Sequence, residues 1–404
     1  PSITMLQVRL LISVALLLEL SNGFVVPTLA RQKYQCSPIF GWVQGADSEW
    51  EWEEDDPDYV APAVTTAVAE ATPTLPSGSF KPKQSLGQNF LRDGNTVIKI
   101  IKAFHKDATR YRANVDRIVE LGPGAGALTD PLVKAYGTDV LQCIEIDPRS
   151  VELLAERHPN LKVNHQDVLQ VDYPKMAQEV GQPLVVFGNL PYYITSQILF
   201  ALADASHSGA VDCATVTMQW EVAQRMVAKT RTKDYGILSV VFQLYADTNC
   251  HFKIPPTVFY PQPKVDSALV GLHFLGPAAL RQRLAGVDPA DLRKVVTTSF
   301  QQRRKTVRNS LKKLAKTICD DDADKAKEIL DAPPLPLPAS VLEAQADGDE
   351  FALMQELPEN WATKRPEELT SGQFVELTRL FFGPKDGVVD NTKPLGGKVW
   401  RKLK

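Results

Sequence analysis

The chain has 404 residues, of which 44% are hydrophobic and 23% charged, so it holds enough apolar side chains for the cores of two ordinary domains. Its five cysteines form no C-x-x-C pair, and its six histidines show no spacing that would bring two ligands to one helical face, which argues against a disulfide framework and a metal site. The net charge of −3 is uneven, because residues 1–80 hold 3 Lys or Arg against 10 Asp or Glu, whereas residues 81–404 hold 42 against 38.

The N-terminal region has the pattern of a targeting segment. Arg9 precedes an apolar run at residues 10–20 that is short for a bilayer and contains Glu19, so we predict a signal-peptide core and no membrane anchor in the mature protein. Phe24 then follows small residues, and Arg31 and Lys33 come without an acid, which resembles the bipartite presequence of algae with complex plastids. We therefore expect delivery to the plastid (chloroplast) stroma, with the mitochondrion as the alternative.

An acidic stretch separates this segment from the first regular pattern. Residues 47–58 (DSEWEWEEDDPD) carry eight acids, and an Ala-, Thr- and Pro-rich stretch follows them. High charge and low periodicity predict a disordered linker. We therefore assign residues 1–79 to a targeting presequence and an acidic linker, and we expect folded structure from about Phe80.

Strand and helix patterns alternate from residue 115. Strands are predicted at 115–122, 139–147, 161–167, 183–190 and 213–219, and helices at 127–136, 149–158 and 195–205. The alternation predicts an α/β fold in which a doubly wound, mainly parallel, Rossmann-like sheet occupies residues 80–275. Runs at 236–247 and 267–274 flank a Pro-rich loop and are expected to close the sheet edge as a hairpin-like pair.

Helical periodicity after residue 276 predicts a small C-terminal helical domain over 276–404, with an insertion at 319–360 and a basic tail. Residues 281–316 carry 11 basic and 2 acidic side chains, a composition that suits a polyanion. A solvated helical face has the same composition, so the patch alone does not decide between the two.

A glycine-rich turn follows the first strand. Residues 120–126 (ELGPGAG) give the pattern E-x-G-x-G-x-G, in which Gly122, Gly124 and Gly126 let the backbone approach a ligand closely. The third glycine comes two residues after the second, so the turn fits the dinucleotide fingerprint poorly. A tight turn without a ligand is the structural alternative.

Acids end the next two strands. Glu145 lies 21 residues beyond Gly124, where doubly wound folds place the carboxylate that accepts both ribose hydroxyls, and Asp147 follows it. Asp167 ends the third strand, where it can accept a hydrogen bond from an adenine amino group. Because the glycine turn has no phosphate-binding lysine, the pocket favours S-adenosylmethionine over a nucleotide. Taken singly, each acid fits a helix cap or a surface charge as well.

The fourth strand ends in Asn189, Leu190, Pro191 and Tyr192, and Asn and Pro both end β pairing. The Asn189 side-chain oxygen and the Leu190 carbonyl can accept the two N–H bonds of an adenine amino group, which aims the nitrogen lone pair at a methyl sulfonium. Such alignment can contribute roughly 7–11 kcal/mol. Tyr192 can stack on the base, which is worth about 1–3 kcal/mol. An Asx-Pro turn is the structural alternative.

Several segments match one family in order and spacing. They are KPKQSLGQNFLRD at 81–93, VELGPGAGALT at 119–129, FGNLPYYITS at 187–196, VFYPQPKVDSALV at 258–270 and TTSFQQRRKTVRNSLK at 297–312. On these segments the chain resembles the KsgA-type ribosomal RNA adenine N6,N6-dimethyltransferases, densely over about 80–320. The resemblance implies a class I S-adenosylmethionine-dependent methyltransferase sheet with a small C-terminal helical domain.

The resemblance also implies roles for individual residues. Phe259 would sandwich the target base with Tyr192, and Asn89 and Leu91 match positions that contact the methyl donor. The candidate donor-binding set is Gln88, Asn89, Leu91, Glu120, Gly122, Gly124, Gly126, Glu145, Ile146, Asp167, Val168 and Asn189. The candidate catalytic set is Asn189, Leu190, Pro191, Tyr192 and Phe259. Basic residues expected to position RNA are Arg303, Arg304, Lys305 and Arg308.

The implied reaction is two successive methyl transfers to N6 of each of two adjacent adenosines in small-subunit rRNA, linked to ribosome biogenesis. S-adenosyl-L-methionine is the implied cofactor. The implied partners are small-subunit rRNA and the pre-ribosomal small subunit, and the protein is expected to be a monomer. Two alternatives stay open, namely a large-subunit rRNA adenine N6-methyltransferase and an organelle transcription or ribosome-assembly factor derived from this fold.

Overall fold

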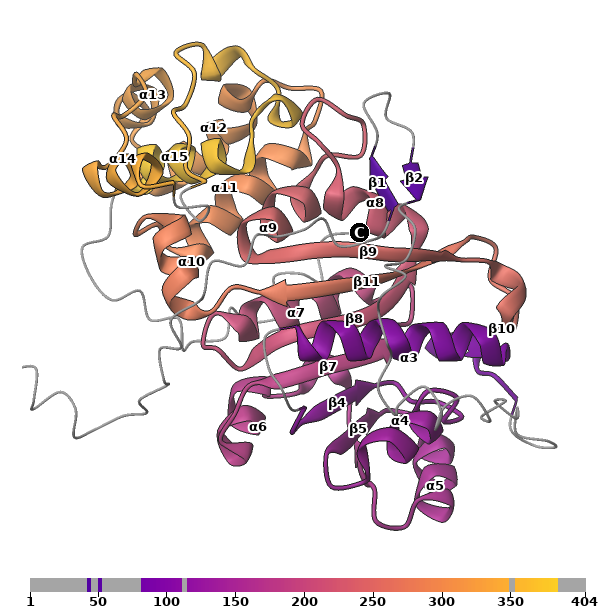
Figure 1. Cartoon of the computed structure of the whole chain (residues 1–404). Helices are drawn as coiled ribbons and strands as arrows, with labels where there is room; N and C mark the ends of the chain where they lie inside the picture. The colour runs from indigo at the N-terminus through magenta and orange to yellow at the C-terminus, as the bar shows by residue number, and fades with distance from the viewer. Residues whose placement is uncertain (1–41, 45–49, 53–80, 111–114, 349–352, 384–404) are drawn as a thin grey trace, which may run out of the picture. The chain divides into compact units, whose positions relative to one another are not determined.

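The computed structural model describes residues 42–44, 50–52, 81–110, 115–348 and 353–383 of the chain (Figure 1). All of them belong to one compact unit, Phe40–Lys404. The expected presequence lies outside the described residues. β1 (Trp42–Gln44), just before the acidic stretch, pairs with β2 (Trp50–Trp52) inside it. Regular pairing therefore reaches residues 50–52, which were expected to be disordered and where tryptophans with high β propensity alternate with acids.

A seven-stranded sheet lies in this unit, in the order β6-β5-β4-β7-β8-β11-β9 (Figure 1). The first five strands in this order, β6, β5, β4, β7 and β8, run parallel to one another. Strand β11 runs antiparallel to both of its neighbours, β8 and β9. The strands are β4 (Ile118–Leu121), β5 (Leu141–Glu145), β6 (Lys162–His165), β7 (Leu184–Asn189), β8 (Val211–Gln219), β9 (Ala246–Ile254) and β11 (Ser267–Phe274). A two-residue ladder joins β3 (Phe90–Leu91) to β10 (Phe259–Tyr260). The predicted Rossmann-like sheet is confirmed.

Helices cover both faces of the sheet. Helix α3 (Gly94–Thr109) contacts β8 and β11 and lies across the sheet in Figure 1. The helices that follow are α4 (Thr129–Tyr136), α5 (Pro148–Arg157), α6 (Tyr173–Val180), α7 (Thr195–Ser206), α8 (Trp220–Val227) and α9 (Ile237–Tyr245). Side-chain caps fix where several begin, as where Asp93 accepts a hydrogen bond from the Thr96 amide at 2.7 Å.

Successive strand residues point to opposite faces and so divide the core into two clusters. Val185 and Phe187 of β7 pack with α3, and the ring centroids of Phe104 and Phe187 lie 4.5 Å apart. Val186 packs on the other face with Ile198 of α7. Because β4 lies between β5 and β7, where the strand order reverses, its carboxyl end is the place where such sheets bind ligands.

The predicted strand at residues 236–247 is wrong, because residues 237–245 form α9. The sheet edge is closed instead by β9, which pairs with β11. The side chains of Val240, Phe242 and Leu244 are all fully buried, so α9 is apolar on nearly every side. An apolar run without a period does not distinguish a buried helix from a buried strand.

The chain continues as α10 (Pro277–Leu284), α11 (Pro289–Gln301), α12 (Val307–Ile318), α13 (Ala323–Asp331), α14 (Ala339–Ala346) and α15 (Ser371–Phe382). α11 and α15 contact each other and α9, and Ser371 Oγ donates to Gln243 Oε1 at 2.7 Å. The helical part therefore shares a core with α9. The expected insertion contributes α13 and α14, while the basic tail beyond residue 383 lies outside the described residues. In the described ranges, no helix combines the length and apolarity needed to cross a bilayer.

Candidate active site

The glycine-rich turn after β4 adopts a backbone conformation that favours glycine. Gly122, Gly124 and Gly126 have positive φ values of 66°, 55° and 86°. A Cβ atom on Gly124 would also lie 2.7 Å from the Phe90 ring. A side chain at any of the three positions would therefore strain the turn, and one at Gly124 or Gly126 would also crowd its neighbours.

A pocket opens at the carboxyl ends of β4, β5, β6 and β7. Most of the predicted site residues line it, namely Gln88, Asn89, Leu91, Glu120, Gly122, Gly124, Glu145, Ile146, Asp167, Val168, Asn189, Leu190, Pro191 and Tyr192. Gly126 and Phe259 do not belong to this lining. Among the described residues that line the pocket, three are acids and none is Lys or Arg. This charge suits a cationic ligand and disfavours a phosphate.

Glu145 ends β5 with both carboxylate oxygens hydrogen-bonded. Its Oε2 accepts from the Gly124 amide at 2.9 Å, and its Oε1 accepts from the amides of Ile146 and Asp147 at 2.7 and 2.8 Å. Burial raises the pKa of Glu145, and these three hydrogen bonds offset part of the increase. A carboxylate offers about four acceptor sites, so Glu145 keeps capacity for a ribose hydroxyl.

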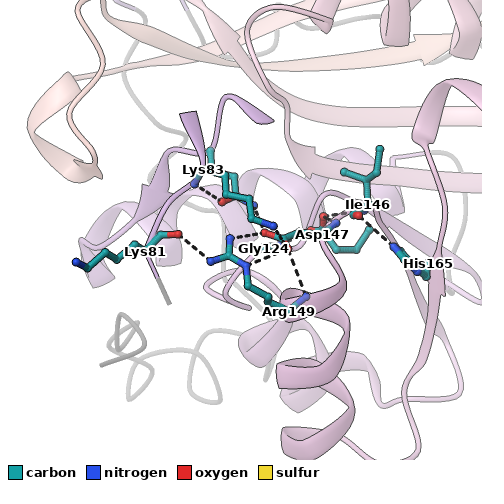
Figure 2. Close-up of polar contacts among 9 residues, drawn as sticks. Lys81, Lys83, Gly124, Ile146, Asp147, Arg149 and His165 are labelled. Carbon is teal, nitrogen blue, oxygen red and sulfur yellow. Dashed lines mark hydrogen bonds and ion pairs between the residues drawn. The ribbon is translucent and has the colours of Figure 1, made fainter. Parts of the chain in front are cut away.

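Two further lining residues lie beside Glu145. Asp167 begins the 3-10 turn Val168–Gln170, where its Oδ1 accepts from the Leu169 amide at 2.9 Å. Ile146 is 47% exposed at the pocket, and its carbonyl lies 3.1 Å from His165 Nε2 (Figure 2). Contacts of Asp167 and Ile146 with a donor adenosine stay predictions.

Glu120 is almost completely buried at the end of β4. Cys143 Sγ donates to its Oε2 at 3.6 Å. Burial, reinforced by the nearby carboxylates of Asp130 and Glu145, raises the pKa of Glu120 to about 8. Below that pH the carboxyl is therefore mostly protonated, and a ligand ammonium group would favour its ionised form. In the described part of the chain, no cluster of three or more His, Cys, Asp or Glu could hold a metal ion.

The Asn189 carboxamide is held from both ends. Its Nδ2 donates to the Asn89 carbonyl at 2.8 Å, and its Oδ1 accepts from the Thr217 hydroxyl. These partners determine which end of the amide is the oxygen. An amide oxygen has two acceptor sites, so Oδ1 can take one more hydrogen bond. The Leu190 amide donates to the Thr217 carbonyl at 3.3 Å, which fixes the strand end beside it.

The two predicted aromatic residues differ in position. Tyr192 is half-buried in the pocket wall and its hydroxyl shares a hydrogen bond with Ser267 Oγ. Burial raises the pKa of Tyr192. Phe259 is only 1% exposed and packs in the core cluster with Leu91 and Ile254. Its role as the second face of a base sandwich stays a prediction, and that role requires its ring to turn towards the pocket.

Residues that orient the predicted ones were not expected from the sequence. Thr217 and Ser267 lie in neighbouring antiparallel strands, β8 and β11, and both contact a residue of the Asn189–Tyr192 segment. The sequence marks Thr217 and Ser267 only as polar residues at the end and the start of apolar strands. Gln88, one of the predicted donor-binding residues, turns its amide towards Asp147, which accepts from Nε2 at 3.0 Å.

The predicted RNA-binding residues divide into two groups. Arg303 donates to the carbonyls of Lys233 and Tyr235 at 2.8 and 2.9 Å, and Arg308 pairs with Asp331 at 2.6 Å. Arg304 and Lys305 are exposed on the turn between α11 and α12. Because Arg303 and Arg308 have intramolecular partners, we expect Arg304 and Lys305 to be the stronger RNA contacts among the four. Contact with RNA stays a prediction for all of them.

The sheet order, the glycine turn, the acid at the end of β5 and the acidic pocket together define a Rossmann-like class I S-adenosylmethionine-dependent methyltransferase. The pocket fits S-adenosylmethionine, because its three acids complement the positive charges of that donor and Glu145 can accept from its ribose. The model of the family described as Ribosomal RNA adenine dimethylase matches residues 79–331. The chain belongs to this family, as its sequence motifs predicted.

Similar proteins agree with this assignment. The chain is 38% identical over 338 residues to the Ribosomal RNA small subunit methyltransferase A of Salinibacter ruber, covering 82% of this chain and 95% of that protein. It is 42% identical over 232 residues to the protein of the same name from Chlorobium chlorochromatii, covering 57% and 81%. A dimethyladenosine transferase from Plasmodium falciparum has a similar solved structure, with a TM-score of 0.51, 22% identity, and coverage of 71% and 95%. At that identity the likeness supports the fold alone.

Proposed function

We propose that the protein methylates N6 of two adjacent adenosines in small-subunit rRNA, twice each, in the course of ribosome biogenesis. The observation that carries this proposal is the Asn189 carboxamide, held with its oxygen oriented at the end of β7 beside an acidic pocket without Lys or Arg among its described lining residues. The relatives named small subunit methyltransferase A support the choice of RNA.

The residues around Asn189 account for reactivity at a weakly nucleophilic amine. Asn189 Oδ1 and the Leu190 carbonyl would accept the two N–H groups of the adenine, so that the nitrogen lone pair points into the donor pocket. S-adenosylmethionine, when bound, supplies a methyl group on a positively charged sulfur. The bound donor would supply this methyl group to the adenine nitrogen, with loss of its C–S bond, and the N–H proton would pass to water. Alignment by Asn189 therefore replaces a general base.

The Tyr192 ring lies next to this position in the pocket lining and supports recognition of a base removed from its stack. Unstacking costs a few kcal/mol, less in a loop, and aromatic stacking recovers about 1–3 kcal/mol. Two of the three acids, Glu145 and Asp167, lie at the ends of neighbouring strands and would hold the donor nucleoside. Glu120, deeper in the pocket, would face a positive group.

Exposed cations near the start of α12 support binding of a folded RNA. Arg303 donates a hydrogen bond to the main-chain carbonyl of Lys233 and so links the Lys233 loop to the turn after α11. The exposed side chains of Lys233, Arg304 and Lys305 therefore occupy one surface region. Phosphate contacts of this kind position the RNA without reading its sequence. We infer that the pre-ribosomal small subunit is the partner and that the protein acts as a monomer.

We also propose that the protein works in the plastid stroma, on the strength of the leader sequence alone. Imaging of residues 1–79 fused to a fluorescent reporter tests this. Signal confined to plastids supports the proposal, whereas signal confined to mitochondria or the secretory pathway contradicts it.

Incubation with labelled methyl donor tests the choice of substrate. Three candidate substrates are compared: immature small subunits, large-subunit rRNA and promoter DNA. We expect label in small-subunit rRNA alone. Label only in large-subunit rRNA would identify the related large-subunit activity, and binding of promoter DNA without any label would favour a factor that no longer needs catalysis.

A further inference from the structure

One buried carboxylate ties the segment before α3 to the turn after β5. The Asp147 side chain is fully buried at the start of α5, two residues after the pocket-lining Glu145. Its Oδ1 accepts from Lys83 Nζ at 3.1 Å, and its Oδ2 accepts from Gln88 Nε2 at 3.0 Å and Arg149 Nη2 at 2.6 Å. Figure 2 shows Lys83 and Arg149 meeting at this carboxylate.

Further bonds close the segment on itself. Gln88 Oε1 accepts from the Lys83 main-chain amide at 2.9 Å, and Arg149 Nη1 donates to the Lys81 carbonyl at 3.1 Å (Figure 2). The hydrogen bonds of Asp147 also determine its charge. Burial alone would raise the pKa of Asp147, but hydrogen bonds from Arg149, Gln88 and Lys83 hold it well below its usual range. Asp147 is therefore ionised, and each partner compensates a buried charge.

The same segment reaches the opposite side of the pocket. Residues 86–91 line the pocket, and the Asn89 carbonyl accepts from Asn189 Nδ2 at 2.8 Å. On the donor side, the Asp147 amide donates to Glu145 Oε1 at 2.8 Å. Residues 83–89 thus connect the turn after Glu145, the candidate ribose ligand, to Asn189, the side chain that would align the target amine.

We propose that Asp147 is a positioning residue for methyl transfer, because it holds residues 83–89 across the donor pocket and this segment orients the Asn189 carboxamide through the Asn89 carbonyl. The inference deepens the function proposed above, and its second half rests on that function. Loosening the segment at Lys83, on the donor side, should therefore both weaken donor binding and slow the step at Asn189.

Two substitutions test the contact, each with a matched control. Lys83→Met removes one partner of Asp147 and does not alter the pocket lining, to which Lys83 does not belong. Lys81→Met makes the same chemical change two residues away, where the contact with Arg149 uses only the main chain. Asp147→Ser removes the carboxylate but keeps a residue that can cap α5. Asp172→Ser makes that change at the cap of α6, outside the pocket.

Calorimetric titration with S-adenosylmethionine, without RNA, gives the first result. We expect Lys83→Met and Asp147→Ser to weaken donor affinity at least fivefold, while Lys81→Met and Asp172→Ser stay within twofold of the original protein. Unchanged affinity in both Lys83→Met and Asp147→Ser would overturn the proposal. Since no RNA is present, this result does not depend on the proposed substrate.

Single-turnover methylation of immature small subunits, at saturating donor, gives the second result. We expect Lys83→Met to slow transfer about tenfold relative to the original chain. In a chain that already carries Asn189→Ala, the same substitution should slow transfer less than twofold, because its effect acts through Asn189. A slowing of equal size in both backgrounds would contradict the orienting role. Absence of any methylation by the original protein would instead contradict the proposed function, and the calorimetric result would still decide whether Asp147 holds the segment.

Discussion

The Asn189 side chain donates a hydrogen bond to the main-chain carbonyl of Asn89, a residue 100 positions earlier in the chain, at 2.8 Å. Asn189 ends a central strand of the sheet, whereas Asn89 belongs to the segment that precedes α3. The sheet therefore supplies the aligning side chain, but a segment outside the sheet sets its orientation. Alignment of the substrate would depend on this orientation, because only the amide oxygen can accept from the amino group of the substrate.

Thr217 should control the rate without controlling donor binding. Its hydroxyl donates to Asn189 Oδ1 and so opposes a flip of the amide. We expect Thr217→Val to reduce the single-turnover rate about tenfold, a loss of about 1.4 kcal/mol, with donor affinity within twofold. Thr217→Ser keeps the hydroxyl and should restore most of the rate. Equal rates for the Val and Ser variants would show that the hydroxyl does not orient Asn189.

Glu120 should make the donor-free protein less stable as the pH rises. Its pKa is about 8 in the folded protein against 4.5 as the ordinary value. Its contribution to the free energy of unfolding is therefore largest below about pH 4.5 and is lost as the pH rises through about 8. A shift of this size corresponds to a few kcal/mol, on the order of 1.4 kcal/mol per pH unit.

Thermal unfolding at pH 5.5 and 8.5 measures this effect. We expect Glu120→Gln to raise the melting temperature relative to the original protein more at pH 8.5 than at pH 5.5. Glu152→Gln, an exposed acid on α5, should leave the difference between the two pH values unchanged. If Glu120→Gln has the same pH dependence as the original protein, Glu120 does not titrate as described.

A side chain at Gly271 should destabilise the fold. A Cβ atom there would contact Asp107 Oδ2 and lie 2.8 Å from His251 Nε2. Asp107 is buried on the face of α3 that packs on the sheet, where it accepts from Thr215 Oγ1 at 2.6 Å and contacts His251 Nε2 at 2.7 Å. We expect Gly271→Ala to lower the free energy of unfolding by about 1–3 kcal/mol in denaturant titrations. Gly276→Ala, with open space around its Cβ, is the control and should cost less, about 0.5–1 kcal/mol, because its only effect is a poorer N-cap for α10.

Arg304 and Lys305 should contribute to RNA affinity through phosphates. Replacing both with Ala is expected to weaken binding to small-subunit rRNA at low salt and to reduce the slope of log affinity against log salt by about 2, one unit for each cation. Lys99→Ala with Lys102→Ala, two exposed lysines of α3, should leave the slope unchanged. A slope equal to that of the original protein would remove these residues from the RNA interface.

Most of the sheet was predictable from the sequence, because its strands are short apolar runs that end in turns or polar residues. The hydrophobic pattern of the sequence distinguishes β4, β5, β6 and β7 from the helices between them. α9 was mistaken for a strand because it is buried on nearly all sides. Its environment comes from α8, β9 and the C-terminal helices, and the contacts with the C-terminal helices have no local signal.

Residues of the site were predictable where a motif lies at the end of a strand. Glu145, Asp167 and Asn189 follow this rule, and all three line one pocket. Thr217 acts on Asn189 from a different strand, β8. Asp147 follows Glu145 in the chain, but its partners Lys83 and Gln88 are known only once a distant segment is brought to it. Phe259 shows a further limit, since a motif identifies the residue but not the side-chain conformation that buries it.

Mass spectrometry of nucleosides from small-subunit rRNA tests the central claim most directly. The full chain or its Asn189→Ala variant is incubated with donor and small subunits that lack the modification. We predict that the original chain produces N6,N6-dimethyladenosine, whereas Asn189→Ala, although it binds the donor with affinity within about threefold, produces less than about 1% as much in the same time. Equal amounts of dimethyladenosine from the two proteins would contradict the assignment of Asn189 as the residue that aligns the amine.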